Sequence, residues 1–114
     1  MKQSNQASRA RLIPVSGDQP VLTNLNQMIH PHTYIHPNAK LATNVKVDPF
    51  SVIHQNVEIG EGTWIGSNVT ILKGVEIGDN VIIGANCLVH RSIPANSVVK
   101  HSEDLKITPL DKKD

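Results

Sequence analysis

The sequence predicts an all-β fold, a parallel β-helix in which every six residues form one short strand and one corner. An aliphatic residue returns at every sixth position from Ile29 to Val89. Turn-forming residues, mainly Pro, Gly, Asn and Asp, fall between these positions. Aromatic residues make up only 3% of the chain, so Ile, Val, Leu and small residues must supply the core.

The repeat divides residues 29–94 into eleven hexads without a break. The first position is always Ile, Leu or Val, and the fifth is always small or β-branched. Residues two apart in a strand share a face, so the fifth position and the next first position point inward together. Three hexads close one triangular coil, which stacks residues 18 apart at about 4.8 Å. We therefore expect a single-stranded helix of between three and four coils.

The segments outside the repeat differ in character. Residues 1–28 are rich in Gln, Asn and Ser, and we expect a polar N-terminal arm that is mobile. Residues 95–114 leave the pattern after Pro94, and we expect a C-terminal cap and tail, because the end of a solenoid must be covered. The β-helix itself is expected over residues 29–94.

Composition argues against several classes of function. The net charge is +1 and no basic run follows the chain, so we expect no nucleic-acid partner. No apolar run approaches the roughly 20 residues that span a bilayer. The lone cysteine, Cys87, forms no internal disulfide, and together with the lack of an export signal it predicts a cytoplasmic setting.

The 18-residue stacking assigns the outward side chains to three walls. The first wall carries an apolar row beside a histidine row: Tyr34, Val52, Thr70, Leu88, and His36, His54, Leu72, His90. The second wall is charged: Lys40, Glu58, Glu76, with Ala42, Gly60, Gly78. The third wall is intermediate: Lys46, Trp64, Ile82, Lys100, with Asp48, Gly66, Gly84. An exposed apolar stripe predicts that the first wall, helped by Trp64 and Ile82, forms a subunit interface.

The hexads IGEGTW, IGSNVT, IGDNVI and IGANCL resemble those of the hexapeptide-repeat acyltransferases, whose fold is a left-handed parallel β-helix. Residues 29–66 resemble the start of the UDP-N-acetylglucosamine acyltransferase of lipid A synthesis, and residues 64–99 resemble the closing coils of sugar O-acetyltransferases. The resemblance implies a homotrimer that moves an acyl group to a sugar or nucleotide-sugar. Acetyl-CoA or acylated acyl carrier protein would be the co-substrate, with no permanently bound cofactor.

Histidine is the side chain best suited to acid and base work near neutral pH. His54 and His90 lie on the expected interface, so their position makes them the candidate catalytic bases. The alternative is that these imidazoles only pack across the trimer. Gly66 and Gly84 form a bare track on which a pantetheine arm could lie, with Lys100 near a CoA phosphate. These three could equally be corner residues and a solvated cap.

Further side chains have simpler explanations. His30, His32 and His36 are spaced like metal ligands, but no Asp, Glu or Cys accompanies them, and we expect no metal site. Cys87 occupies an inward fifth position and is expected to be inert core. The asparagines at the fourth position are expected to turn corners at positive φ: Asn38, Asn44, Asn56, Asn68, Asn80 and Asn86. Asn68 and Asn86 stack and could form an amide ladder.

Each branch of the family keeps its catalytic histidine where this chain has none. The lipid A branch carries it in later coils, and the O-acetyltransferases carry it on a loop before the tryptophan. Here the hexads pass through that point, at Trp64, without an insertion. A rival interpretation is therefore a noncatalytic trimeric scaffold, truncated, chimeric or designed, that keeps the fold without a working site.

Overall fold

The computed structural model describes residues 21–102 and 105–110, and the strands among them form a left-handed parallel β-helix of about four turns. The described residues contain strands and corners but no helix, so none of them forms a helix that could cross a membrane. Each strand is two residues long. The strands are β2 (Val21–Leu22), β3 (Met28–Ile29), β4 (Tyr34–Ile35), β5 (Lys40–Leu41), β6 (Lys46–Val47), β7 (Val52–Ile53), β8 (Glu58–Ile59), β9 (Trp64–Ile65), β10 (Thr70–Ile71), β11 (Glu76–Ile77), β12 (Ile82–Ile83), β13 (Leu88–Val89) and β14 (Val98–Val99). From β3 to β13, each consists of the sixth residue of one hexad and the first residue of the next.

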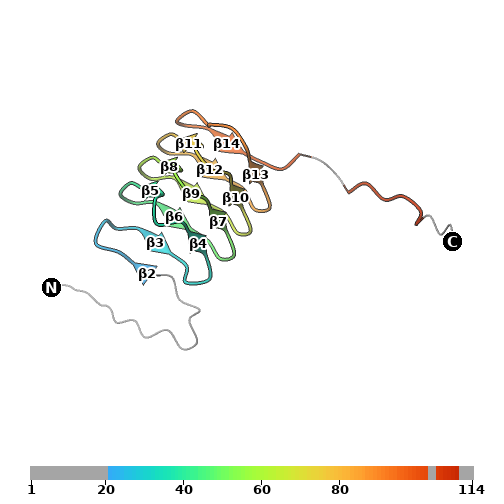
Figure 1. Ribbon diagram of the computed structural model, residues 1–114. Coiled ribbons are helices and arrows are strands. Elements are labelled where there is room, and N and C mark those ends of the chain that lie inside the picture. Colours follow the sequence, from blue (N-terminus) through green and yellow to red (C-terminus); the bar gives the residue numbers. More distant parts are fainter. Residues whose placement is uncertain (1–20, 103–104, 111–114) are drawn as a thin grey trace.

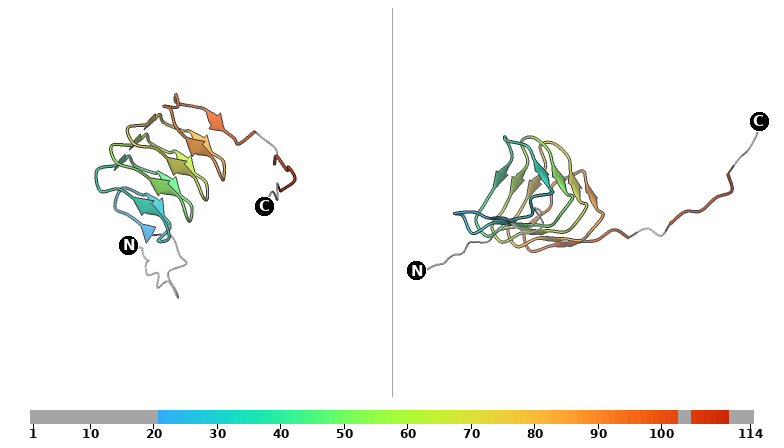
Figure 2. Two further views of the ribbon diagram at one scale, coloured as in Figure 1. Left: turned by 45° about the vertical axis from the view of Figure 1, so that its right-hand side comes forward. Right: turned by 90° about the horizontal axis from the view of Figure 1, so that it is seen from below.

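The three walls of the prism are three sheets, and their strands stack along the helix axis (Figures 1 and 2). The first wall is β4, β7, β10 and β13; the second is β5, β8 and β11; the third is β2, β3, β6, β9, β12 and β14. Thr70 pairs with Val52 below and Leu88 above, a step of 18 residues in each direction. The predicted three hexads per coil are confirmed.

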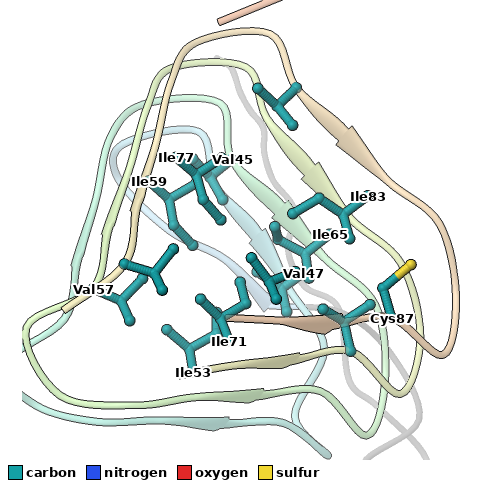
Figure 3. Close-up of a cluster of buried hydrophobic side chains, with 14 residues drawn as sticks. Val45, Val47, Ile53, Val57, Ile59, Ile65, Ile71, Ile77, Ile83 and Cys87 are labelled. Atoms are coloured by element: carbon teal, nitrogen blue, oxygen red, sulfur yellow. The ribbon is translucent and has the colours of Figure 1, made fainter. Parts of the chain in front are cut away.

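The core is a column of aliphatic side chains that points into the triangle (Figure 3). Ile53, Ile65 and Ile71 from first positions are fully buried, as are Val57 and Val69 from fifth positions. Cys87 is also buried, as its fifth position predicts. Branched aliphatic residues fill most of the narrow interior, and no aromatic side chain is among the buried described residues.

Most corners place the fourth residue at positive φ. The expectation is confirmed at five of the six asparagines: Asn44, Asn56, Asn68, Asn80 and Asn86. It is wrong at Asn38, because the corners that follow His30 and His36 are closed differently. There the histidine Nδ1 accepts a hydrogen bond from the backbone N–H two residues later, from His32 at 3.1 Å and from Asn38 at 3.0 Å.

The last coil is two residues shorter than the others. Ile82 pairs with Val98 and Ile77 bridges to Ile93, steps of 16 residues instead of 18. The row predicted for the third wall is therefore wrong at its end, where Val98 rather than Lys100 lies over Ile82. The coil is shorter between Val89 and Ile93, which are four residues apart instead of six. The β-helix continues to β14, beyond residue 94, where we expected it to end.

The N-terminal end of the helix is closed by a hairpin. β2 runs antiparallel to β3, and residues 21–28, which we expected to belong to a mobile arm, form this hairpin and its turn. Gln27 is buried at the fifth position, and its Nε2 donates to the carbonyls of Leu41 at 2.7 Å and Ala42 at 2.9 Å. The remainder of the expected arm, residues 1–20, lies outside the described residues.

Candidate active site

The histidine row predicted for the first wall is present in the structure. His36, His54, Leu72 and His90 each follow the last residue of a first-wall strand, at β4, β7, β10 and β13. A groove of about 310 Å³ opens at this end of the wall, and it is lined by His36, His54, Gln55, Leu72 and Lys73. We call it the histidine groove. It brings an imidazole, an amide, an ammonium group and an apolar side chain together.

The two imidazoles of the histidine groove differ in their hydrogen bonds. His36 Nδ1 accepts from the N–H of Asn38, which requires the other ring nitrogen, Nε2, to carry the proton of the neutral form. Its ring also meets Tyr34 edge to face at 6.4 Å between centroids. His54 is half-buried, and no described protein group is hydrogen-bonded to its ring. Both ring nitrogens of His54 are therefore available for hydrogen bonds to a bound molecule.

His90 stands apart from the groove. It is exposed and does not line the histidine groove. Two coils separate it from His54, about 9.6 Å along the axis, with Leu72 between them. The structure thus brings His54 together with His36 rather than with His90, the other candidate base.

The glycine track and the lysine lie in one row along the third wall. Each residue follows the last residue of a strand: Gly66 after β9, Gly84 after β12 and Lys100 after β14. The N–H of Gly66 donates to the carbonyl of Ile83 and that of Gly84 donates to the carbonyl of Val99, each at 2.8 Å. A Cβ on Gly66 would lie 2.8 Å from the Ile83 oxygen, so the next coil leaves no room for a side chain. At Gly84 the nearest atom would be the Val99 oxygen at 3.4 Å, an ordinary contact. Packing therefore explains the glycine at position 66 but not the one at position 84.

The histidine row and the glycine track lie on different walls. Gly66 and Gly84 end the third wall, and the full width of the first wall separates them from His54. One chain alone does not bring the two candidate sets together.

The three closely spaced histidines are not grouped around one point in the structure. His30 and His32 lie 5.4 Å apart between ring centroids, and His32 stacks on Phe50 at 5.9 Å, whereas His36 belongs to the first wall. Among the described residues, no three His, Cys, Asp or Glu side chains are grouped so that they could hold a metal ion.

Sequence reasoning missed a polar cluster on the third wall. Trp64 Nε1 donates to a carboxylate oxygen of Asp48 at 2.9 Å, and Lys46 Nζ lies 4.5 Å from the centre of the Trp64 ring. The signal in the sequence was the stacking itself, since Lys46 and Trp64 are 18 residues apart. The cluster fixes an aromatic ring that is 42% exposed on the wall that carries the glycine track.

It also missed a groove of about 700 Å³ on the second wall, which we expected to be only a solvated surface. Its lining includes Ala42, Gly60 and Gly78, which offer no side chain beyond a methyl group, with Ile93 at one end. Glu58 and Glu76 stand beside it on β8 and β11. We call it the second-wall groove. Packing against the next coil requires the glycine at position 78, because a Cβ there would lie 2.5 Å from the Ala95 nitrogen.

Residues 56–91 match the family model described as bacterial transferase hexapeptide (six repeats). The resemblance stated from the hexads is confirmed in this segment, which includes the second half of the histidine row and both glycines of the track. The search of curated proteins finds no match to the chain.

Several solved acetyltransferases have a similar structure. A mutant perosamine N-acetyltransferase from Caulobacter crescentus, solved with CoA and GDP-perosamine, aligns with a TM-score of 0.51 at 20% identity, over 66% of this chain and 53% of that one. The acetyltransferase domain of PglB from Neisseria gonorrhoeae, solved with acetyl coenzyme A, aligns at 0.42 and 19% over 68% and 55%. Serine acetyltransferase isoform 3 from Entamoeba histolytica, in complex with cysteine, aligns at 0.38 and 25% over 72% and 37%.

The first of these likenesses supports the β-helical fold. This chain spans about half the length of the perosamine enzyme with which it aligns, 53%.

Proposed function

We propose that the protein is an acyltransferase that moves an acyl group from a CoA thioester to a hydroxyl or amine of a sugar or nucleotide-sugar. The observation that carries this proposal is His54, a half-buried imidazole that lines a groove and has both nitrogens free of described protein partners. The hexapeptide repeat and the likeness to acetyltransferases supply the class of reaction. Acylated acyl carrier protein is the other donor to test, and a cytoplasmic setting would supply either one.

The chemistry assigned to His54 is that of a general base. His54 removes the proton from the acceptor hydroxyl or amine as the oxygen or nitrogen of that group attacks the thioester carbonyl. The tetrahedral oxyanion then collapses, the carbon–sulfur bond breaks, and the proton on the imidazole passes to the departing thiolate. Backbone N–H groups near the carbonyl would stabilise the oxyanion.

We further propose that the site is completed between subunits of a homotrimer. The first wall of one copy, through Tyr34, His36, Val52, His54, Leu72, Leu88 and His90, would face the third wall of its neighbour. That contact would bring Gly66, Gly84 and Lys100 of the neighbour opposite the histidine row. The separation of the two candidate sets on one chain supports this arrangement, since only a second copy can close the gap.

The test is a calorimetric titration of the protein with acetyl-CoA, followed by an acceptor screen that detects the CoA thiol released. The buried Cys87 keeps the background of a thiol reagent low. We expect saturable binding near one site per chain. His54→Asn should retain binding and lower turnover by about 100-fold or more, the usual contribution of a general base. His32→Asn removes an imidazole at a corner position that asparagine fills in other coils, so it should leave turnover unchanged.

His90→Asn decides between the two candidate bases. A loss in this variant with normal activity in His54→Asn would move the site to the C-terminal end of the first wall.

The second candidate is a noncatalytic trimeric scaffold. The observation in its favour is the unbroken six-residue spacing of strands from β3 to β13, which leaves no inserted loop near Trp64. If neither acetyl-CoA nor acylated acyl carrier protein binds, the scaffold becomes the better description.

A further inference from the structure

The described segment after the last coil carries large apolar side chains that nothing covers. Leu105 is 87% exposed, Ile107 84% and Leu110 79%. All six residues from 105 to 110 are exposed and outside any strand, and the chain leaves the body of the β-helix there (Figures 1 and 2). Single exposed leucines are ordinary, but three in six residues beside an otherwise closed core indicate a surface that meets a partner.

The pattern of this segment suits an extended chain lying in a groove. Leu105 and Ile107 alternate with Lys106 and Thr108, so in an extended conformation the two apolar side chains share one face. Pro109 prevents the segment from continuing as a helix and favours the extended form at Thr108. The apolar face would contact the bottom of a groove, while the long side chain of Lys106 reaches its edge.

The protein offers two grooves, and their charges discriminate between them. The histidine groove includes Lys73, which would repel Lys106. The lining of the second-wall groove carries two carboxylates, those of Glu58 and Glu76, against one ammonium group, that of Lys40, and the rest of it is mostly apolar. It is also the larger groove, about 700 Å³ against about 310 Å³. Charge and space therefore both favour the second wall.

We propose that residues 105–110 of one copy lie in the second-wall groove of another copy. The segment starts from the third wall, beyond Val99, and the eleven residues from 100 to 110 extend at most about 36 Å. That length suffices to cross the end of a neighbouring β-helix of the same chain. Because the segment and the groove are different surfaces of the chain, a contact between them is heterologous and can close a ring.

This inference goes beyond acyl transfer and does not require it. The segment would act as a strap that holds subunits together and leaves the histidine groove open. A failed titration with acetyl-CoA would not affect it, and a failed strap would leave the chemistry of His54 untouched.

The test is disulfide cross-linking between two full-length variants in a Cys87→Val background. One variant carries Thr108→Cys, which keeps every apolar residue of the strap, and the other carries Glu76→Cys and an affinity tag. After subunit exchange by mixing and mild oxidation, we expect the mixed disulfide as the main covalent product on a denaturing gel. Lys73→Cys replaces Glu76→Cys as the matched control on the other groove and should cross-link at least about tenfold less.

A second measurement guards against random collision. Replacing Leu105, Ile107 and Leu110 by serine in the Thr108→Cys chain should lower the yield of mixed disulfide about tenfold or more, because the apolar contact is lost. An unchanged yield would overturn the proposal. Preferential cross-linking to position 73, or cross-links formed only within one chain when both cysteines are placed on it, would overturn it as well.

Discussion

Two buried hydroxyl groups connect successive coils at the level of single residues. Thr63 Oγ1 donates to the carbonyl of Gly78 at 2.8 Å and accepts from the N–H of Val81 at 3.1 Å. Ser51 makes the same pair of contacts with Gly66 and Val69. Both side chains are buried, and the N–H groups of Val69 and Val81 that they accept from are buried as well, so the hydroxyls replace water as the partners of these groups.

Thr63→Val should lower the free energy of unfolding by about 1–3 kcal/mol. The substitution keeps the shape but leaves the Gly78 carbonyl and the Val81 N–H without their partner. Chemical denaturation monitored by circular dichroism measures the effect. Thr43→Val, at an exposed corner, is the matched control and should change little; equal stability of the two variants would contradict the assigned role of the hydroxyl.

Cys87 should make stability depend on alkaline pH. Burial raises the pKa of its thiol above the ordinary value of 9.0, although a backbone hydrogen bond from His101 opposes the shift. Since the folded state holds the proton more tightly than the unfolded state, the contribution is complete below about pH 9 and is lost as the pH rises through the folded pKa.

We therefore expect wild type to lose more stability than Cys87→Val between pH 8 and about pH 10.5. Valine already fills the equivalent fifth position at Val69, Val75 and Val81, so the variant should fold. Parallel pH dependence in the two proteins would show that the thiol is not responsible.

The two glycines of the third wall should respond differently to a methyl group. Gly66→Ala places a Cβ 2.8 Å from the Ile83 oxygen and 3.0 Å from the Ala85 nitrogen, and should cost about 1–3 kcal/mol. Gly84→Ala makes only an ordinary contact and should keep wild-type stability. Gly84→Ala therefore tests the CoA track cleanly: a weaker calorimetric affinity for acetyl-CoA at unchanged melting temperature would support the track, and unchanged affinity would remove Gly84 from it.

At the scale of elements, one corner carries an unfavourable residue. Phe50 has a φ of 68°, a conformation that costs most residues about 1–2 kcal/mol and that asparagine tolerates. Its ring is 65% exposed, so its stack on His32 recovers little of that cost. The same position one coil later is Asn68, whose Nδ2 donates to Asn86 at 2.8 Å in the amide ladder that the sequence suggested.

Phe50→Asn should raise the melting temperature and increase the free energy of unfolding by about 1 kcal/mol. It relieves the strain of a positive φ at this corner and places an amide next to Asn68. The matched control is Asn56→Ala at a φ of 60°, which should lower stability by a similar amount. Loss of stability in Phe50→Asn would mean that the aromatic stack, not the corner, dominates at this position.

The six-residue period made the strands predictable, but it did not decide the register of the last coil. The six-residue period fixes which residues point inward, because a branched side chain must fill each inward site of a narrow triangle. VHRSIP fits that pattern from Val89, but IPANSV fits it equally from Ile93, with Asn96 at a positive-φ corner. The shorter coil is selected by the pairing in the structure, that of Ile77 with Ile93 and of Ile82 with Val98.

For the candidate site, too, the sequence predicted which wall carries each histidine but not the hydrogen bonds of its ring. Stacking by 18 placed His36, His54 and His90 on one wall correctly. Which imidazole is engaged depends on side-chain rotation, and the use of His36 Nδ1 to close its own corner leaves no trace in the spacing. The second-wall groove was missed because the sequence pattern described this wall only by its charged row, and a row of side chains does not show where the surface is hollowed.

At the scale of the whole molecule, the walls are unequal. The first wall exposes Tyr34 and Leu88, and the third exposes Trp64, Ile82 and Val98, whereas the second carries the charged row of Lys40, Glu58 and Glu76. A closed ring in which the first wall of each copy meets the third wall of the next would bury both apolar surfaces. The second wall would then face outward, where its groove is open to a strap.

Leu88→Lys should convert the proposed trimer to monomers, because it places a charge in the apolar row of the first wall, on its last strand β13, without touching the core. Leu88 is 59% exposed within one chain, so the folded monomer should remain. Light scattering should report a mass about one third that of wild type at unchanged circular dichroism. Glu61→Gln makes the same change in net charge at an exposed corner away from both walls and should leave the mass unaltered. A wild-type protein that is itself monomeric would contradict the assembly, and with it the placement of the glycine track opposite His54.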